Sequence, residues 1–147
     1  MPRSPLTALA GALVVVAVGL VLWRVASPSP GPLEPAWDRV ACARCHMLVS
    51  DPAFAAQLQL ASGEVLFFDD PGCLLLERAE RADAAGAAWF HDSAGSGWLA
   101  EADARFVAGA ETPMAHGFAA VSAGSAPGAV DAGAALAALR AGEAGAP

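Results

Sequence analysis

The chain has 147 residues, enough for one compact domain or two very small ones once a targeting segment is set aside. It contains no lysine, and its eight basic residues against fifteen acidic ones give a net charge of −7. This acidic balance argues against a nucleic-acid partner held through phosphate contacts, because such partners are bound by clustered Lys and Arg side chains.

The N-terminal region is an uninterrupted apolar block. Residues Leu6 to Leu22 carry no charge; Arg3 precedes them and Trp23-Arg24 closes them. A block of this length can span a bilayer, whereas a cleaved signal peptide has a shorter apolar region and a small-residue cleavage site. We therefore predict that residues 1–26 form an uncleaved single-pass anchor in the cytoplasmic membrane, with the rest facing the periplasm or the exterior. A cleaved signal segment is the alternative.

A proline-rich segment separates this block from the remainder of the chain. Residues 27–36 contain four prolines within SPSPGPLEP and cannot hold regular hydrogen-bonded structure, so we expect an extended linker. The predicted folded domain covers residues 37–142, and residues 143–147 are expected to be a disordered tail.

Turn signals and apolar periodicity divide the predicted domain into short elements. A hairpin turning at Ser62-Gly63 precedes a helix with Asp70 as its N-cap and Pro71 as its first residue, which is expected to stop near Gly86. The predicted strands cover residues 54–60, 64–68, 88–91, 98–106 (a short strand or an amphipathic turn) and 117–122, and a final helix covers residues 130–141. Strands and helix recur in both halves, which predicts an α+β fold of two small units packed together.

Most of the metal-binding chemistry lies within six residues. Cys42, Cys45, His46 and Met47 place two thiols, an imidazole and a thioether close together in a chain with only one further cysteine. Soft thiolate and thioether ligands favour Cu(I) over ions that prefer oxygen. On an extended strand Cys45 and Met47 would face the same side, and Met114 could supply a third soft ligand, with His116 two residues further on.

Four other interpretations of the cluster remain open. The sequence CARCH matches the c-type haem attachment pattern, with His46 as the proximal ligand and Met114 as a distal one. A thioredoxin-like Cys-x-x-Cys pair should begin a helix, whereas here a turn and a hairpin follow. A zinc site would need Cys73, His46, His91 or His116 to complete the set. A simple disulfide or a pair of buried thiols is the structural alternative.

Further motifs surround the cluster in both halves of the domain. They comprise Cys45-x-Met47, Asp51-Pro52, Ala56-Gln57, Gly63, Phe68-Asp69-Asp70-x-Gly72-Cys73, Trp89-Phe90-His91-Asp92, Gly97-Trp98-Leu99, the segment 102–107 and Thr112-Pro113-Met114. In order and spacing, residues 40–120 resemble the NosL family, copper-binding accessory proteins associated with nitrous oxide reductase maturation. His46 stands where that family often has glycine.

The resemblance implies two ββαβ-type units and one Cu(I) ion held by Cys45, Met47 and Met114. Cys42, His46 and His116 are further ligand candidates. It also implies a metallochaperone without enzymatic activity, which would receive copper from a donor and deliver it to a cuproenzyme such as nitrous oxide reductase or to its assembly complex. A c-type haem electron carrier and a thiol-disulfide oxidoreductase are the alternative functions.

Three other residue types have structural explanations. Asp69 and Asp70 could bind a hard metal ion, but acidic residues before a helix are expected to cap it. Cys73, within the first turn of that helix, is expected to be a small packing residue. His91 on a predicted strand is expected to be structural rather than a ligand.

Overall fold

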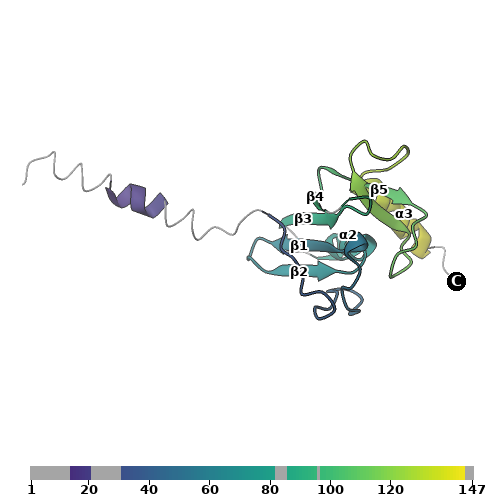
Figure 1. Ribbon diagram of the computed structural model, residues 1–147, viewed down its shortest axis with the longest axis horizontal. Coiled ribbons are helices and arrows are strands. Elements are labelled where there is room, and N and C mark those ends of the chain that lie inside the picture. Colours follow the sequence, from purple (N-terminus) through teal and green to yellow (C-terminus); the bar gives the residue numbers. More distant parts are fainter. Residues whose placement is uncertain (1–13, 21–30, 82–85, 96, 145–147) are drawn as a thin grey trace, which may run out of the picture. The chain divides into compact units, whose positions relative to one another are not determined.

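The computed structural model describes residues 14–20, 31–81, 86–95 and 97–144 (Figure 1). The chain divides into two units, residues 1–31 and residues 32–147. In the first unit the described residues 14–20 are helical and expose Val14, Val15 and Val16. Within the described part of the chain, no helix has the length and apolar character needed to cross a membrane. Most of the predicted anchor, residues 1–26, lies outside the described residues.

The second unit is an α+β domain, as the sequence predicts. Its elements in chain order are η1 (Pro52–Phe54), β1 (Ala56–Leu60), β2 (Val65–Phe68), α2 (Pro71–Glu80), β3 (Gly86–His91), β4 (Trp98–Ala100), β5 (Ala104–Ala108), β6 (Phe118–Ser122) and α3 (Ala132–Ala144). The run β1-β2-α2-β3 has the order ββαβ. In the second half β5 and β6 precede α3, and β4 joins the first sheet.

The first sheet has four antiparallel strands in the order β2-β1-β3-β4. The predicted hairpin is confirmed: Ala56 pairs with Phe68 and Gln59 with Val65, and the turn contains Gly63 at a φ of 91°. Glycine adopts this left-handed conformation without the steric cost that a Cβ brings. Asp69 directly follows the end of β2, so the hairpin determines its position.

The predicted helix begins where its capping residues place it. The Asp70 side chain accepts a hydrogen bond from the backbone N–H of Gly72, and Pro71 occupies the first turn. The leucines at 74, 75 and 76 are buried in the hydrophobic core. The predicted stop near Gly86 is wrong: α2 ends at Glu80, and Gly86 opens β3. A Cβ at Gly86 would lie 1.8 Å from the Gln59 carbonyl oxygen, so this glycine permits close strand pairing instead.

The second sheet pairs β5 with β6, and α3 lies beside β5 in Figure 1. The predicted segment 98–106 is thus two strands, β4 and β5, belonging to different sheets. Phe90 on β3 and Phe106 on β5 are fully buried and meet edge to face, with ring centroids 4.9 Å apart. Such a pair adds about 0.5–1.5 kcal/mol beyond area burial, and here it links the two sheets.

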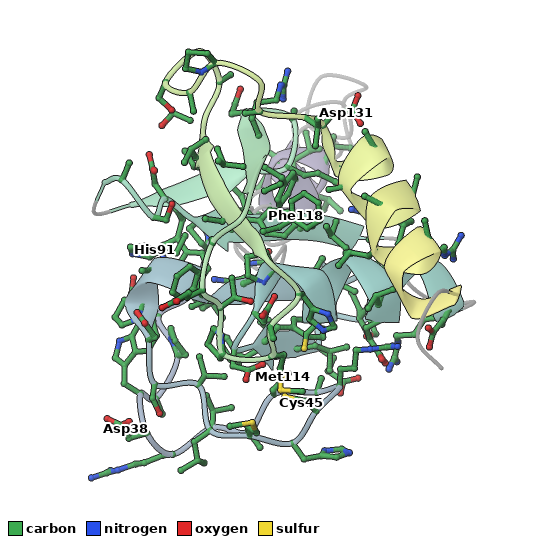
Figure 2. The ribbon with its side chains drawn as sticks, turned by 90° about the vertical axis from the view of Figure 1, so that its right-hand side faces the viewer. Asp38, Cys45, His91, Met114, Phe118 and Asp131 are labelled. Atoms are coloured by element: carbon green, nitrogen blue, oxygen red, sulfur yellow. The ribbon has the colours of Figure 1, made fainter. Side chains whose placement is uncertain are left out.

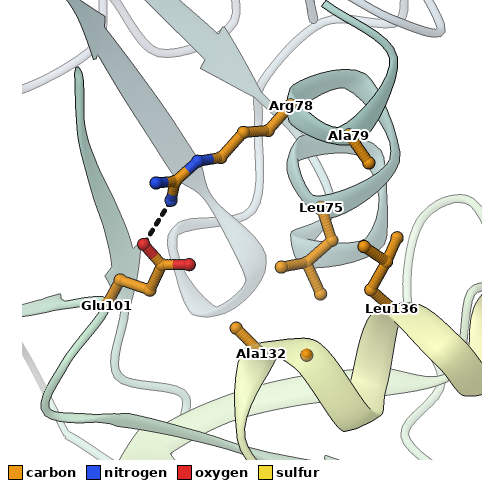
Figure 3. Close-up of a pocket in the computed structure, with 7 residues that line it drawn as sticks. Leu75, Arg78, Ala79, Glu101, Ala132 and Leu136 are labelled. Atoms are coloured by element: carbon orange, nitrogen blue, oxygen red, sulfur yellow. Dashed lines mark hydrogen bonds and ion pairs between the residues drawn. The ribbon is translucent and has the colours of Figure 1, made fainter. Parts of the chain in front are cut away.

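Helices α2 and α3 contact each other, and a surface cavity of about 260 Å³ lies beside their contact (Figure 3). Leu75 and Ala79 of α2 line it together with Ala132 and Leu136 of α3. At its edge Arg78 forms an ion pair with Glu101. This cavity is separate from the cysteine residues described below.

The compact unit starts before the predicted domain boundary at residue 37. Leu33 donates its backbone N–H to Gln57 Oε1 at 2.9 Å and accepts from Gln57 Nε2 at 2.8 Å. Gln57 is fully buried, so these two bonds satisfy its amide. Glu34 also accepts a hydrogen bond from Trp98 Nε1. The last residues of the predicted linker therefore dock on the first sheet. At the other end α3 continues to Ala144, past the predicted helix end at residue 141.

Candidate metal centre

All three cysteines of the chain converge on one carboxylate. The Sγ atoms of Cys42, Cys45 and Cys73 and a carboxylate oxygen of Asp69 all lie within 4.8 Å of one another. Cys42 and Cys45 belong to the turn before β1, Asp69 follows β2, and Cys73 lies in the first turn of α2. Three thiols and a carboxylate at this spacing form a group that could hold a metal ion.

A tight turn, rather than an extended strand, presents the first two cysteines. The backbone N–H of Cys42 donates to the Met47 carbonyl at 2.7 Å, and that of His46 donates to the Cys42 carbonyl at 3.1 Å. Ala41 and Leu48 form an antiparallel bridge that closes the turn. The expectation that Cys45 and Met47 share one face of a strand is therefore wrong, because these hydrogen bonds fold the segment back on itself.

His46 has a left-handed backbone conformation, with a φ of 65°. This conformation costs a residue with a Cβ and favours glycine. It lets the chain reverse between Cys45 and Met47, while the His46 side chain is exposed.

Asp69 is the buried acceptor at the centre of the group. Cys45 Sγ donates to its Oδ1 at 3.2 Å, and its Oδ2 is buried without a hydrogen-bond partner among the described residues. The residue is only 2% exposed. Burying a carboxylate oxygen without a hydrogen-bond partner costs free energy, so a cation bound at this position would stabilise it.

Cys42 and Cys73 form the deepest part of the group, and each is 1% exposed. A hydrogen bond from Cys73 lowers the pKa of the Cys42 thiol to about 6, although its burial acts in the opposite direction. The same hydrogen bond, together with burial, raises the pKa of the Cys73 thiol. Desolvation raises the pKa of the Cys45 thiol to about 12, and the nearby Asp69 and Cys42 act in the same direction. One of the three thiols is thus favoured as a thiolate.

Met114 lies in the loop between β5 and β6, next to this group. Its backbone N–H donates to Asp70 Oδ2 at 3.1 Å, and its side chain is half-buried against the core. Figure 2 shows Cys45 and Met114 at the same end of the domain. Asp70 therefore caps α2 with one oxygen and positions the Met114 loop with the other.

The remaining predicted ligands lie outside the group of three thiols and one carboxylate. Met47 is 51% exposed at the end of the turn. Among the described residues, the group of convergent Cys, His, Asp and Glu ligands includes neither His46 nor His116. His116 instead packs on Gly72, where a Cβ would come within 2.5 Å of the His116 Cβ. The His91 ring meets the Trp98 ring edge to face with centroids 5.4 Å apart, and His91 Nδ1 is buried without a hydrogen-bond partner among the described residues.

Two members of the group, Asp69 and Cys73, were considered from the sequence only as secondary possibilities, for a hard metal ion and for zinc, and structural roles were favoured for both. Asp69 was expected to cap the helix, but Asp70 alone fills that position. Cys73 is buried in the core, as expected of a packing residue, and its Sγ also lies within 4.8 Å of the Cys42 Sγ. A usable signal was present, because both residues flank a helix N-terminus, where backbone N–H groups favour anionic side chains.

Comparisons of the chain with models of known protein families, with curated proteins and with solved structures gave no match. The geometry alone therefore defines the class: an α+β domain with a buried thiol and carboxylate group able to hold a metal ion.

Proposed function

We propose that this chain is an extracytoplasmic Cu(I)-binding accessory protein of the NosL type, which carries copper and catalyses no reaction. The observation that supports it best is the position of Cys45, the least buried of the three thiols, beside the Asp70-anchored loop of Met114. We call Cys45, Met47 and Met114 the rim ligands. Thiolate and thioether ligands are those that select Cu(I).

The conformation of His46 supports the resemblance independently of the cysteines. In the NosL family this position is often glycine, and here its φ of 65° is one that glycine adopts without strain. The backbone of the Cys-x-Met segment therefore suits the residue that the family prefers, even though this chain carries histidine.

Exposure of the rim suits delivery rather than permanent storage. Met47 is half-exposed, so an acceptor's thiolate or imidazole could approach an ion held there and replace the rim ligands one at a time. The partners would be a copper donor and a cuproenzyme such as nitrous oxide reductase or its assembly complex. An N-terminal anchor would keep donor and acceptor in one membrane layer and raise their effective concentration.

The burial of Cys42 weighs against the haem alternative. A c-type haem would need both thiols and His46 of CARCH to face the porphyrin, whereas Cys42 is 1% exposed and its Sγ lies within 4.8 Å of the Cys73 Sγ. The thioredoxin alternative needs a Cys-x-x-Cys pair at a helix start, and this pair lies in a turn.

The test is an anaerobic titration of the full chain with Cu(I) against a competing chelator, after expression in a strain able to attach haem. We expect one tightly bound Cu(I) and no haem absorbance. Cys45→Ser, Met47→Leu and Met114→Leu should each weaken binding, while the methionine variants keep the fold because the exchange roughly conserves volume. His46→Gly is the control that should retain binding. Covalent haem, or unchanged affinity in both methionine variants, would overturn the proposal.

A further inference from the structure

The buried part of the cysteine group offers a different ligand set from the rim. We propose that Cys42, Cys45, Cys73 and Asp69 form a four-ligand site for a divalent ion of the zinc class, used as an alternative to Cu(I) at the rim. We call these four residues the closed site. This inference goes beyond copper delivery and depends on different residues, with only Cys45 shared.

The first argument for a zinc-class ion is the number and type of ligands. Zinc takes four ligands in a tetrahedral arrangement, drawn from Cys, His and Asp or Glu side chains. The closed site supplies three sulfur atoms and one carboxylate oxygen, all within 4.8 Å of one another. Four protein ligands complete a tetrahedral arrangement and leave no position for the water ligand of a catalytic site. Three of the four residues are buried and the fourth is half-buried.

The second argument is Asp69, because a carboxylate ligand favours zinc over Cu(I). Its Oδ2 is buried and has no hydrogen-bond partner in the described structure, although the residue is only 2% exposed. Cu(I) gains little from a carboxylate, whereas zinc binds carboxylate oxygen readily. A divalent ion would give this oxygen the partner that the protein lacks.

The start of α2 offsets part of the negative charge that three thiolates and one carboxylate bring together. Cys73 lies in the first turn of α2, whose N-terminus carries partial positive charge. The backbone N–H groups at this helix start favour anionic side chains, and the divalent ion itself supplies the remaining compensation.

Cobalt(II) is the probe, because its visible spectrum reports both geometry and thiolate ligation. The reduced full chain in detergent is titrated anaerobically with Co(II) and then with Zn(II). We expect one Co(II) per chain, intense tetrahedral bands with thiolate charge-transfer absorption, and loss of these bands as Zn(II) replaces cobalt. Absence of binding, or the weak bands of an octahedral oxygen site, would overturn the proposal in the wild-type protein itself.

Variants then distinguish the closed site from the rim. Cys73→Ser and Asp69→Asn should weaken Co(II) and Zn(II) binding by more than the roughly 10- to 100-fold cost of losing an outer-shell partner. Met47→Leu and Met114→Leu should leave divalent binding unchanged, and near-ultraviolet circular dichroism should verify that each variant is folded. Equal effects of the methionine and Cys73 variants would contradict the closed site. Failure of Cu(I) binding alone would instead refute the proposed function and leave this inference standing.

Discussion

Arg44 forms a two-pronged ion pair with Glu80, with nitrogen to oxygen distances of 2.9 and 3.0 Å. It stands between Cys42 and Cys45 in sequence, and Glu80 lies at the end of the helix that begins near Cys73. A weaker contact to Glu77 at 3.5 Å adds to the pair. The turn that carries two of the thiols is thereby fastened to the helix that carries the third.

We expect Arg44→Gln to weaken metal binding a few-fold with little effect on the fold. The pair is solvent-accessible, so its contribution to stability is small, but its geometry limits the positions that the turn can take. Arg105→Gln, which removes the same charge on β5, is the matched control. Competition titrations with Cu(I) and Co(II) check the result, and an unchanged affinity for both ions would show that the turn holds its position without this pair.

Asp70→Asn should separate capping from loop positioning. The remaining amide oxygen can still accept from Gly72, but the amide nitrogen would face the Met114 N–H donor that now bonds to Asp70 Oδ2. Leaving that donor unsatisfied costs about 1–3 kcal/mol of unfolding free energy.

The measurements on Asp70→Asn are chemical denaturation and Cu(I) affinity. We expect the free energy of unfolding and the Cu(I) affinity both to decrease. The affinity of the closed site for divalent ions should decrease less. Asp70→Ala removes the cap as well and should be the less stable of the two variants. Equal stability of the asparagine variant and the wild type would show that the Met114 loop needs no support from Asp70.

Gly72→Ala should be destabilising although alanine is the better helix former. The added Cβ would lie 2.5 Å from the His116 Cβ, an atom fixed to its backbone, so the loop containing Met114 must move. Overpacking of this kind costs about 1–3 kcal/mol. Gly142→Ala in α3 meets nothing within 4 Å and should be neutral or slightly stabilising. Thermal unfolding of the two variants compares them directly.

The metal-free, reduced protein should gain stability as the pH rises from about 6 to 9. The pKa of Cys42 is lowered from 9.0 to about 6, so between these values the folded chain binds fewer protons than the unfolded chain. The free energy of unfolding therefore increases with pH in this window, and this contribution is lost as the pH falls through 6. The pKa of Cys45 is raised from 9.0 to about 12, so this thiol makes the free energy of unfolding decrease with rising pH. That decrease takes place only above about pH 9, outside the window considered.

Thiolate absorbance and denaturation at several pH values test this dependence. We expect one thiolate to appear with a midpoint near pH 6, as the pKa of Cys42 is lowered to about 6. Cys73→Ala should move the midpoint upward, because the Cys73 hydrogen bond is the largest cause of the low value. Cys42→Ser is the control that should lose the stability gradient. A midpoint that stays near 6 in Cys73→Ala would show that backbone donors alone hold the thiolate.

The sequence alone was sufficient for features that depend on neighbouring residues. The hairpin at Gly63, the Asp70 cap and the strand β6 follow from turn chemistry, capping and alternation, which act over a few residues. Cys42 and Cys45 were found in the same way, because their spacing is local. Met114 was selected from the sequence because soft ligands are rare in this chain, and its role as a ligand stays a prediction.

Only the tertiary structure decided which side chains share the site. Asp69 and Cys73 join Cys42 because the β1–β2 hairpin and the start of α2 bring residues about 30 positions apart within ligand distance. No local pattern distinguishes an aspartate that caps a helix from one that faces three thiols. Gly86 shows the same limit: its pairing with Leu60 on β1, which its neighbours in sequence do not reveal, makes it a strand residue rather than a helix stop.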